Sequence, residues 1–223
     1  PIAVIEAKDN KHSLGSGMQQ ALGYAEALDV PFVFSSNGDG FLFHDRSGTG
    51  DQVETELSLD QFPSPIELWQ RYCRWKGLEG DARQKAEAPY YDDGSGRMPR
   101  YYQTNAINRT VEAVARGQDR ILLVMATGTG KTRTAIALVD QLIRGNWVKR
   151  VLFLADRTAL VRQAKRAFAA NLPDTAVVNL QDEKRGEGRV YTATYPTMLN
   201  LLEHDGQDGG TRRFGAGYFD LVI

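Results

Sequence analysis

The sequence predicts an α/β protein whose second half is built on a parallel β-sheet, and two observations carry that prediction. From residue 101 onward, short apolar runs typical of strands alternate with longer amphipathic stretches typical of helices. Such alternation indicates a parallel sheet covered by helices on both faces. Between the apolar run 121–125 and the helix-like run 133–143 lies Ala-Thr-Gly-Thr-Gly-Lys-Thr at 126–132, which has the form of a phosphate-binding loop.

The loop at 126–132 predicts binding of a nucleoside triphosphate. Its glycines let backbone N–H groups close around phosphate oxygens, Lys131 can reach the β- and γ-phosphates, and the Thr132 hydroxyl can ligate Mg²⁺. A glycine-rich turn that merely joins a strand to a helix is the alternative, but Gly-Lys-Thr at this place argues against it. We therefore expect ATP and Mg²⁺ as cofactors and a RecA-like core. The expected nucleotide ligands are Thr127, Gly128, Thr129, Gly130, Lys131 and Thr132.

Composition limits the remaining classes of protein. The chain has 223 residues, is 42% hydrophobic and 25% charged, and carries a net charge of −1, which is ordinary for a globular protein. No apolar run is long enough to span a bilayer and no signal peptide opens the chain, so we expect a cytoplasmic protein without a membrane partner. The single Cys73 excludes an intrachain disulfide and a cysteine-based zinc site.

The first sixty residues predict a strand, a helix and a hairpin in that order. The predicted elements are a strand at 2–7, a helix at 16–28 and two strands at 31–35 and 41–43 around a turn at 37–40. The stretch 46–60 turns polar and acidic, and the first domain is expected to end there. Ser64 and Glu67 then form a capping box that starts a helix ending near Gly77, and the charged stretch 79–96 is expected to be an exposed loop.

The second half predicts a regular alternation of helices and strands. The expected helices cover 104–116, 131–144 and 159–169, and the expected strands cover 120–125, 150–155, 176–180, 190–194 and 218–223. The segment 141–170 is locally basic, with seven Lys or Arg residues against Asp156. Such a segment can meet a phosphate backbone or can be a solvated helix face, and charge alone does not separate the two.

Three further segments resemble motifs of superfamily 2 helicases and translocases. Residues 99–103 resemble the Q-motif, in which the amide of Gln103 would pair with adenine; the alternative is a polar residue that opens a helix. Residues 151–160 resemble motif Ia, with Arg157 as the expected phosphate contact. Residues 190–198 resemble motif Ib, with Thr194 and Thr197 as hydroxyl donors to a DNA strand, although a plain helix cap at Thr197 explains that residue nearly as well.

The strand at 219–223 resembles the one that leads into the Asp-Glu box of these ATPases. That box would hold Mg²⁺ and position the attacking water, and it does not occur within the chain. The sequence also opens without a start methionine. We therefore expect the chain to be an internal piece of a longer protein and to be inactive by itself in ATP turnover and DNA cleavage.

Glu6 and Lys8 resemble the Glu-x-Lys half of a PD-(D/E)xK nuclease site. Two residues apart on a strand, they point to the same face, so that Glu6 can ligate Mg²⁺ while the ammonium beside it orients or activates water. Alone, this pair is more often a surface ion pair. Gln20 and Tyr24, four apart on the next helix, share a face and match the Gln-x-x-x-Tyr element of the RecB-like branch of these nucleases.

Taken in order, Glu6, Lys8, Gln20, Tyr24 and the run 35–38, joined to a helicase-like ATPase, closely resemble the R (restriction) subunit of type I restriction-modification enzymes. The resemblance implies a partial PD-(D/E)xK nuclease domain at 1–57, a helical linker at 58–98 and a RecA-like domain at 99–223. It further implies ATP-driven translocation of double-stranded DNA coupled to its cleavage, with methyltransferase and specificity subunits as partners. In that family an aspartate on the preceding strand completes the nuclease metal site.

Two other functions remain open from the residues alone. The chain could belong to a superfamily 2 helicase or translocase whose nuclease-like module is inactive and serves as a DNA-binding or docking element. It could also belong to a P-loop ATPase that acts on protein or on a small molecule. Helicase motifs beyond residue 223 would exclude the second of these.

Overall fold

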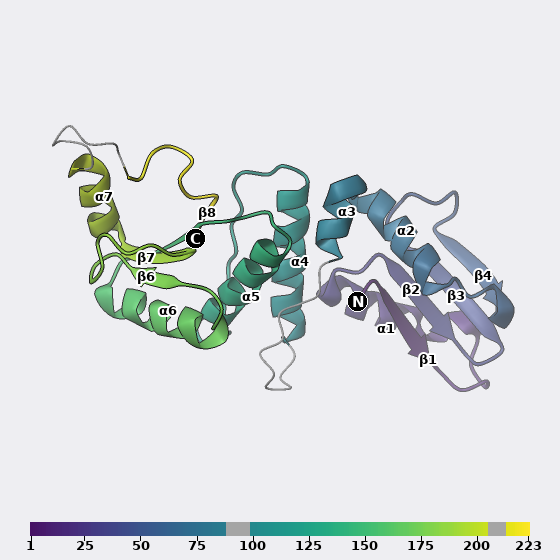
Figure 1. The fold of residues 1–223 in the computed structure, drawn as a ribbon. Coiled ribbons are helices and arrows are strands. Elements are labelled where there is room, and N and C mark those ends of the chain that lie inside the picture. The colour runs from purple at the N-terminus through teal and green to yellow at the C-terminus, as the bar shows by residue number, and fades with distance from the viewer. Residues whose placement is uncertain (88–98, 205–212) are drawn as a thin grey trace. The chain divides into compact units, whose positions relative to one another are not determined.

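The computed structural model describes residues 1–87, 99–204 and 213–223 of the chain (Figure 1). These residues form two compact units, each with its own sheet. The first unit comprises Pro1–Glu87 together with Arg100–Ile121, and the second is formed chiefly by Leu122–Ile223. Within the described residues, no helix is long and apolar enough to cross a membrane.

The first unit is built on a mixed four-stranded sheet. Its strands are β1 (Ala3–Ala7), β2 (Phe32–Ser36), β3 (Gly40–Asp45) and β4 (Glu54–Ser58), in that order across the sheet. β1 runs parallel to β2, whereas β2, β3 and β4 are antiparallel. The predicted first strand and hairpin are confirmed. β4 lies in the polar stretch where no strand was predicted, because only Leu57 in it is strongly apolar.

Both faces of β2 are covered, which explains its nearly unbroken apolar sequence. Successive side chains of a strand point to opposite faces, so that Val33 and Phe34 enter different clusters. The cluster beneath α1 (Met18–Leu28) contains Met18, Ala21, Ala25, Val30 and Val33. The cluster beneath α2 (Pro65–Lys76) contains Phe32, Phe34, Phe43, Leu68, Tyr72, Cys73 and Leu78. A short 3-10 turn, η1 (Leu14–Gly17), leads into α1.

The start of α2 matches the predicted capping box. The Ser64 hydroxyl accepts a bond from the Glu67 N–H at 3.3 Å, and the Glu67 carboxylate accepts one from the Ser64 N–H at 2.8 Å. The Ser64 N–H and, at 2.9 Å, the Ser64 hydroxyl both donate to the Glu67 carboxylate, and these two bonds hold the pKa of that carboxyl below its usual value. Between β4 and α2 runs a second 3-10 turn, η2 (Leu59–Gln61).

The stretch after α2 corrects one prediction. Residues 79–96 were expected to be loop, but Gly80–Ala86 form the helix α3; residues 88–98 lie outside the described residues. α3 is too polar to show a helical apolar pattern in the sequence, and side-chain contacts hold it in place. Glu87, just after it, accepts bonds from Trp69 Nε1 at 2.6 Å and from Arg83 Nε at 2.9 Å.

Helix α4 (Tyr101–Ala115) is anchored within the first unit. Its buried Glu112 accepts a hydrogen bond from the Tyr72 hydroxyl and lies 3.6 Å from the Lys76 ammonium. On another side of the helix, Arg109 pairs with Asp29 at 2.8 Å, at the end of α1. α4 is therefore bonded to both helices that cover the sheet.

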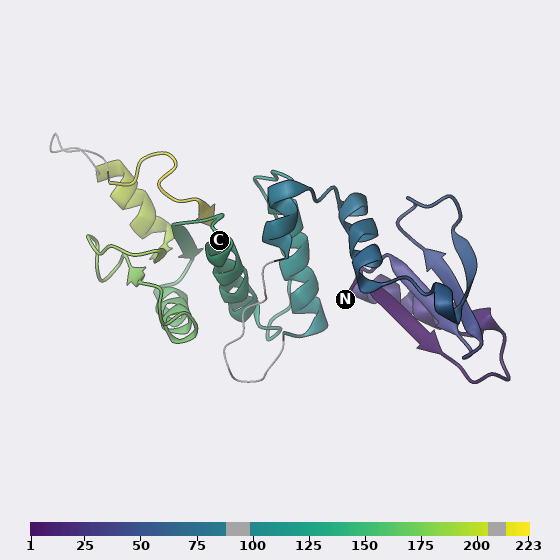
Figure 2. The same cartoon turned by 45° about the vertical axis from the view of Figure 1, so that its right-hand side comes forward.

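The second unit has the predicted parallel sheet, in the order β6-β7-β5-β8. Its strands are β5 (Val151–Ala155), β6 (Val177–Asn179), β7 (Val190–Thr194) and β8 (Leu221–Val222). Its helices are α5 (Lys131–Arg144), α6 (Thr158–Asn171) and α7 (Tyr195–His204). Figures 1 and 2 show α6 and α7 on opposite sides of this sheet.

The alternation of side chains along the strands agrees with two covered faces. Phe153 of β5 meets Phe168 of α6, with ring centroids 5.7 Å apart. Its neighbour Leu152 belongs to the opposite cluster, which contains Met198 of α7. The predicted α/β class, with a parallel sheet between helices, is therefore confirmed.

One predicted strand does not form in the described structure. Residues 120–125 were expected to be a strand, but they have no strand assignment, and Leu122 and Val124 are 85% and 87% exposed. A strand exists only where its backbone groups pair with a neighbour. Among the described residues, the second sheet consists of β6, β7, β5 and β8, and none of these strands pairs with 120–125.

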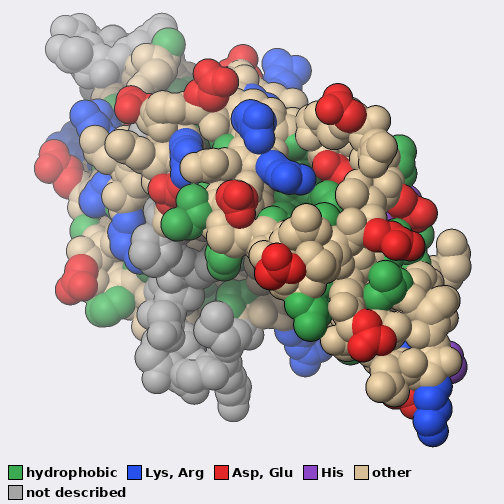
Figure 3. Space-filling model, turned by 90° about the vertical axis from the view of Figure 1, so that its right-hand side faces the viewer, with side chains coloured by type: hydrophobic (Ala, Val, Ile, Leu, Met, Phe, Trp, Pro, Cys, Tyr) green, Lys and Arg blue, Asp and Glu red, His purple; other side chains and the backbone are tan. Residues whose placement is uncertain are grey.

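Charge is mixed on the face of the molecule drawn in Figure 3. Asp and Glu side chains are scattered across it, and a group of Lys and Arg side chains lies toward its upper middle. This face therefore presents no continuous area of one sign of charge.

Candidate functional site

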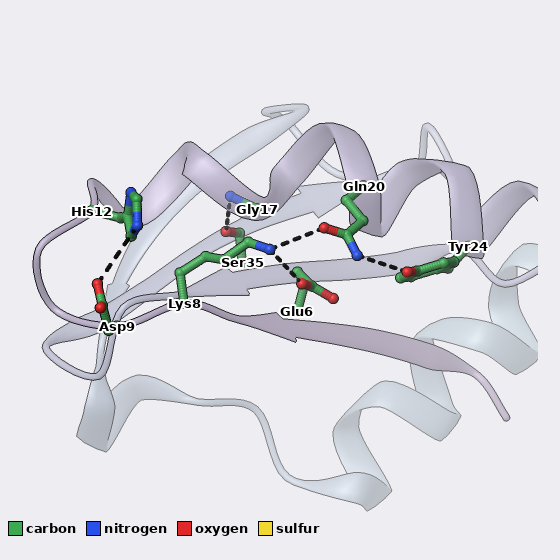
Figure 4. A network of polar contacts seen from close by, with 8 residues as sticks. All are labelled: Glu6, Lys8, Asp9, His12, Gly17, Gln20, Tyr24 and Ser35. Carbon is green, nitrogen blue, oxygen red and sulfur yellow. Dashed lines mark hydrogen bonds and ion pairs between the residues drawn. The ribbon is translucent and has the colours of Figure 1, made fainter.

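The predicted nuclease residues form one connected polar chain at the carboxyl end of β1. Lys8 Nζ donates to Glu6 Oε1 at 2.9 Å and to Gln20 Oε1 at 3.0 Å, and Gln20 Nε2 donates to the Tyr24 hydroxyl at 2.7 Å (Figure 4). All four predicted residues are thus brought together: Glu6 from β1, Lys8 directly after it, and Gln20 and Tyr24 from α1. The side chains of Glu6 and Lys8 are 17% and 32% exposed, so the pair lies partly shielded yet open to a ligand.

The position of this chain follows from the pleat of β1. Every second side chain along this segment lies on the face turned to α1, namely those of Val4, Glu6 and Lys8. Val4 packs against the apolar cluster beneath the helix. The same face becomes polar at Glu6 and Lys8, where α1 presents Gln20. Gln20 and Tyr24 lie one helical turn apart, so their side chains follow one another along the helix.

Two further residues lie beside Glu6: Gly17, which the sequence analysis did not single out, and Ser35, which it gave only as part of the run 35–38. Ser35 pairs with Glu6 across the β1–β2 ladder, is fully buried, and accepts a hydrogen bond from the Gly17 N–H at 3.1 Å. A Cβ atom on Gly17 would lie 2.8 Å from Glu6 Cγ. A sequence pattern cannot reveal these contacts, because Glu6 and Ser35 lie eleven and eighteen positions from Gly17 and approach it only in the tertiary fold.

The carboxylate of Glu6 fits Mg²⁺ as one part of a ligand set. Among the described residues there is no group of three or more His, Cys, Asp or Glu that could hold a metal ion. Mg²⁺ is commonly held by only one or two carboxylates, with water and substrate phosphate completing the shell. Glu6 can supply one such carboxylate, beside the Lys8 ammonium.

The phosphate loop has the backbone shape that its sequence predicts. Gly128 and Gly130 have φ values of 80° and 86°, which glycine adopts without strain, and Lys131 starts α5 directly after them. Lys131 Nζ donates to the carbonyls of Met125 and Ala126 at 3.0 and 3.1 Å. The lysine thus bends back over the loop, toward the place where phosphate oxygens are expected.

The other predicted nucleotide ligands belong to the same turn. Thr129 N–H and its hydroxyl both donate to the Ala126 carbonyl, at 3.4 and 2.6 Å. Thr127 and Gly128 lie exposed before it, and Thr132 is half-buried in the first turn of α5. Thr132 is therefore placed at the helix N-terminus, where a hydroxyl can meet a metal ion bound to phosphate.

Gln103 is buried in the first turn of α4, and its amide oxygen accepts a bond from the Arg100 N–H at 2.9 Å. The structure thus shows the helix-opening role that was the alternative to adenine recognition. The helix cap uses only the amide oxygen of Gln103, whereas adenine recognition would also use its amide N–H₂ group.

The residues predicted to contact DNA lie at the carboxyl ends of two neighbouring strands. Arg157 follows β5, and its side chain is 80% exposed. Thr194 ends β7, and its hydroxyl lies 2.9 Å from that of Thr197 in α7. β5 and β7 are adjacent and parallel, so all three residues belong to one edge of the sheet, where open α/β folds bind their ligands.

Asp220 has a structural role before β8. Its Oδ2 atom accepts bonds from the Arg150 and Lys149 N–H groups at 2.9 and 2.8 Å. These bonds hold the pKa of the Asp220 carboxyl below its usual value. They fix the start of β5 against the start of β8.

Comparison with known proteins relates the chain to subunits of restriction enzymes. Residues 97–223 match the family described as type III restriction enzyme, res subunit. The endonuclease subunit of the type I restriction enzyme EcoAI from Escherichia coli is 57% identical over 166 residues, which cover 74% of this chain and 20% of that protein. The EcoKI endonuclease subunit from E. coli K12 is 29% identical over 209 residues, which cover 75% of this chain and 18% of that protein.

A solved structure supports the same assignment over the whole chain. It is a fragment assigned as an HsdR subunit of a type I restriction enzyme from Vibrio vulnificus YJ016, with a TM-score of 0.77 and 34% identity. The match covers 100% of this chain and 38% of that one. The chain thus spans about a fifth of the length of the curated relatives. Its sequence and fold together show that the chain belongs to the family of HsdR-type endonuclease subunits of type I restriction enzymes.

Proposed function

We propose that the protein couples ATP-driven translocation along double-stranded DNA to cleavage of unmodified DNA. The observation that carries the proposal is the chain of bonds Glu6–Lys8–Gln20–Tyr24, present in the same polypeptide as a well-formed phosphate loop. In this proposal residues 1–57 contribute half of a PD-(D/E)xK nuclease domain, residues 58–98 link it onward, and residues 99–223 belong to the first RecA-like domain.

In the nuclease site, Glu6 would hold Mg²⁺, which when bound stabilises the charge that develops on the scissile phosphate. The Lys8 ammonium lies beside that carboxylate and would orient the attacking water. Gln20 holds Lys8 from the other side by accepting its second hydrogen bond, and Tyr24 holds the Gln20 amide. Gln20 and Tyr24 thus fix the direction of the Lys8 side chain.

In the motor, Lys131 would bind the β- and γ-phosphates of ATP and Thr132 the Mg²⁺ that accompanies them. Arg157, Thr194 and Thr197 would contact the DNA backbone from the strand edge that they share. Methyltransferase and specificity subunits are the proposed partners, because the relatives are named as subunits of restriction enzymes. An enzyme that acts on such DNA works in the cytoplasm.

The test uses the intact subunit, assembled with its partners. Glu6→Gln removes the carboxylate charge and is expected to reduce DNA cleavage at least a hundredfold, while DNA-stimulated ATP hydrolysis stays within twofold. Lys131→Ala is expected to abolish both ATP hydrolysis and cleavage, because its charge on the phosphates is lost. Lys184→Ala, at an exposed lysine of the unit that carries Lys131 and outside the basic segment 141–170, is the control and should change neither.

A second candidate function is a superfamily 2 translocase with a nuclease-like module that only docks DNA or a partner. The observation in its favour is that the described residues contain no group of three or more His, Cys, Asp or Glu that could hold a metal ion. Cleavage that persists in Glu6→Gln would favour this candidate. Loss of cleavage with retained ATPase would exclude it.

A further inference from the structure

Gly17 is one of several described glycines with too little space for a side chain, and what it approaches is the candidate site residue Glu6. A Cβ atom built on Gly17 would lie 2.8 Å from Glu6 Cγ, 3.0 Å from Ser35 Oγ and 3.4 Å from Glu6 Cβ. Carbon atoms that are not bonded do not approach to 2.8 Å without a shift of one of them. The first atom is the middle of the Glu6 side chain, so the shift would displace the carboxylate.

The backbone of Gly17 does not itself require glycine. Its φ and ψ are −91° and −8°, a conformation open to any residue. A glycine at positive φ, such as Gly128, is required by its backbone conformation. At Gly17 glycine is required because neighbouring atoms leave no space for a side chain. The missing side chain at this position therefore serves the contact with Glu6 and Ser35.

Ser35 ties this contact into the sheet. Its hydroxyl is fully buried and accepts the Gly17 N–H at 3.1 Å, which satisfies a backbone donor at the start of α1. Ser35 also stands opposite Glu6 in the β1–β2 ladder. The turn into α1 is thus fixed at the level of Glu6, and Figure 4 shows Gly17 and Ser35 bonded next to the Lys8–Glu6 pair.

We propose that Gly17 and Ser35 are positioning residues of the nuclease site, which hold the Glu6 side chain in the rotamer that presents its carboxylate to Lys8 and to the metal ion. The proposal rests on the proposed nuclease function. On the side of Glu6 that faces the start of α1, the backbone of Gly17 fills the space without a side chain. The Ser35 hydroxyl holds that backbone in place by its hydrogen bond. The carboxylate is left to face Lys8 Nζ, 2.9 Å away.

The first test is Gly17→Ala in the intact subunit with its partners. The added methyl group must push the Glu6 stem aside, and a displacement of about 1 Å at a reacting centre can cost a hundredfold in rate. We expect cleavage to fall at least tenfold and the half-saturating Mg²⁺ concentration for cleavage to rise several-fold, with DNA-stimulated ATPase within twofold. Ser35→Ala should act in the same direction.

The matched control is Gly23→Ala. Gly23 lies in the same helix, is exposed, and has no atom within 4 Å of a built Cβ. Cleavage and its Mg²⁺ dependence should stay as in the wild type. If Gly17→Ala behaves like Gly23→Ala while Glu6→Gln is inactive, the positioning role is wrong and the nuclease function stands. If Glu6→Gln cleaves normally, the nuclease function itself is wrong.

A second measurement does not depend on activity. Gly17→Ala should lower the thermal unfolding midpoint of the first unit by several degrees in the wild type. In the background Glu6→Ala, which has no Cγ atom to collide with, the same substitution should lower it much less. Equal losses in both backgrounds, or a loss of cleavage with an unchanged Mg²⁺ dependence, would show a general folding defect and overturn the proposal.

Discussion

At the scale of single residues, Gln103 shows how one side chain can satisfy two demands. Its carbonyl oxygen accepts the Arg100 N–H and so caps α4, and its amide N–H₂ group is the part that adenine N7 would need. Burial of the residue favours the cap, since an unpaired N–H at a buried helix start is unfavourable. Adenine recognition remains a proposal that a substitution can separate from capping.

The substitution Gln103→Glu separates adenine recognition from capping of α4. A glutamate still accepts the Arg100 N–H and keeps the cap, but it has no amide donor and repels the acceptor N7. We predict a loss of at least tenfold in ATP affinity, a smaller preference for ATP over GTP, and nearly unchanged protection of the α4 amides from hydrogen exchange. Gln103→Ala should lose both. Unchanged nucleotide preference in Gln103→Glu would leave Gln103 with the capping role alone.

At the scale of elements, the start of α2 is held by a reciprocal pair of hydrogen bonds. Ser64 and Glu67 each bond the backbone N–H of the other, which satisfies two of the four free donors of a helix start. Substitution of a capping serine by alanine typically costs about 1 kcal/mol.

We therefore predict that Ser64→Ala lowers the free energy of unfolding of the first unit by about 1 kcal/mol, as measured by denaturant titration. Ser58→Ala is a useful comparison, since Ser58 precedes only the single-turn η2 and should cost less. A larger loss from Ser58→Ala would mean that the capping box of α2 contributes little.

The elements also show why some of the fold could be predicted and some could not. β2 could be predicted from its short apolar run, and α1 from apolar residues that recur with the helical period of 3.6. α3 carries no such repeat, and it packs against α4, which begins only at Tyr101. The run 120–125 has the composition of a strand, but strand formation depends on a partner that composition does not reveal.

The candidate site was predictable to a similar degree. Local spacing places each of the pairs Glu6–Lys8 and Gln20–Tyr24 on one face, and a hydrogen bond from Lys8 to Gln20 joins the two pairs in the structure; their role in a nuclease site stays a prediction. Gly17 and Ser35 were not found as site residues, because the need for glycine arises from a contact between α1 and β1. Short-range spacing determines which face a residue occupies, whereas the tertiary fold determines what it touches.

At the scale of the whole molecule, the two compact units do not follow the functional segments predicted from the sequence. α4 precedes the phosphate loop and carries Gln103, yet it belongs to the first unit by its contacts. The centre of these contacts is Glu112, which is 5% exposed and meets both Tyr72 and Lys76 of α2. The Lys76 ammonium also lies 3.9 Å from the centre of the Trp75 ring.

Glu112→Ala would leave the Lys76 ammonium largely buried without its carboxylate, and removal of one partner of a buried ion pair typically costs about 3 kcal/mol or more. If α2 and α4 form one cooperative unit, hydrogen exchange should speed up in both helices together, while the amides of α5, α6 and β5 keep their protection. Glu26→Ala, at an exposed acid of the same unit, should leave all of them unchanged. Faster exchange in α4 alone, with α2 protected, would instead place α4 outside the first unit and return it to the segment 99–223, to which the sequence analysis assigned it.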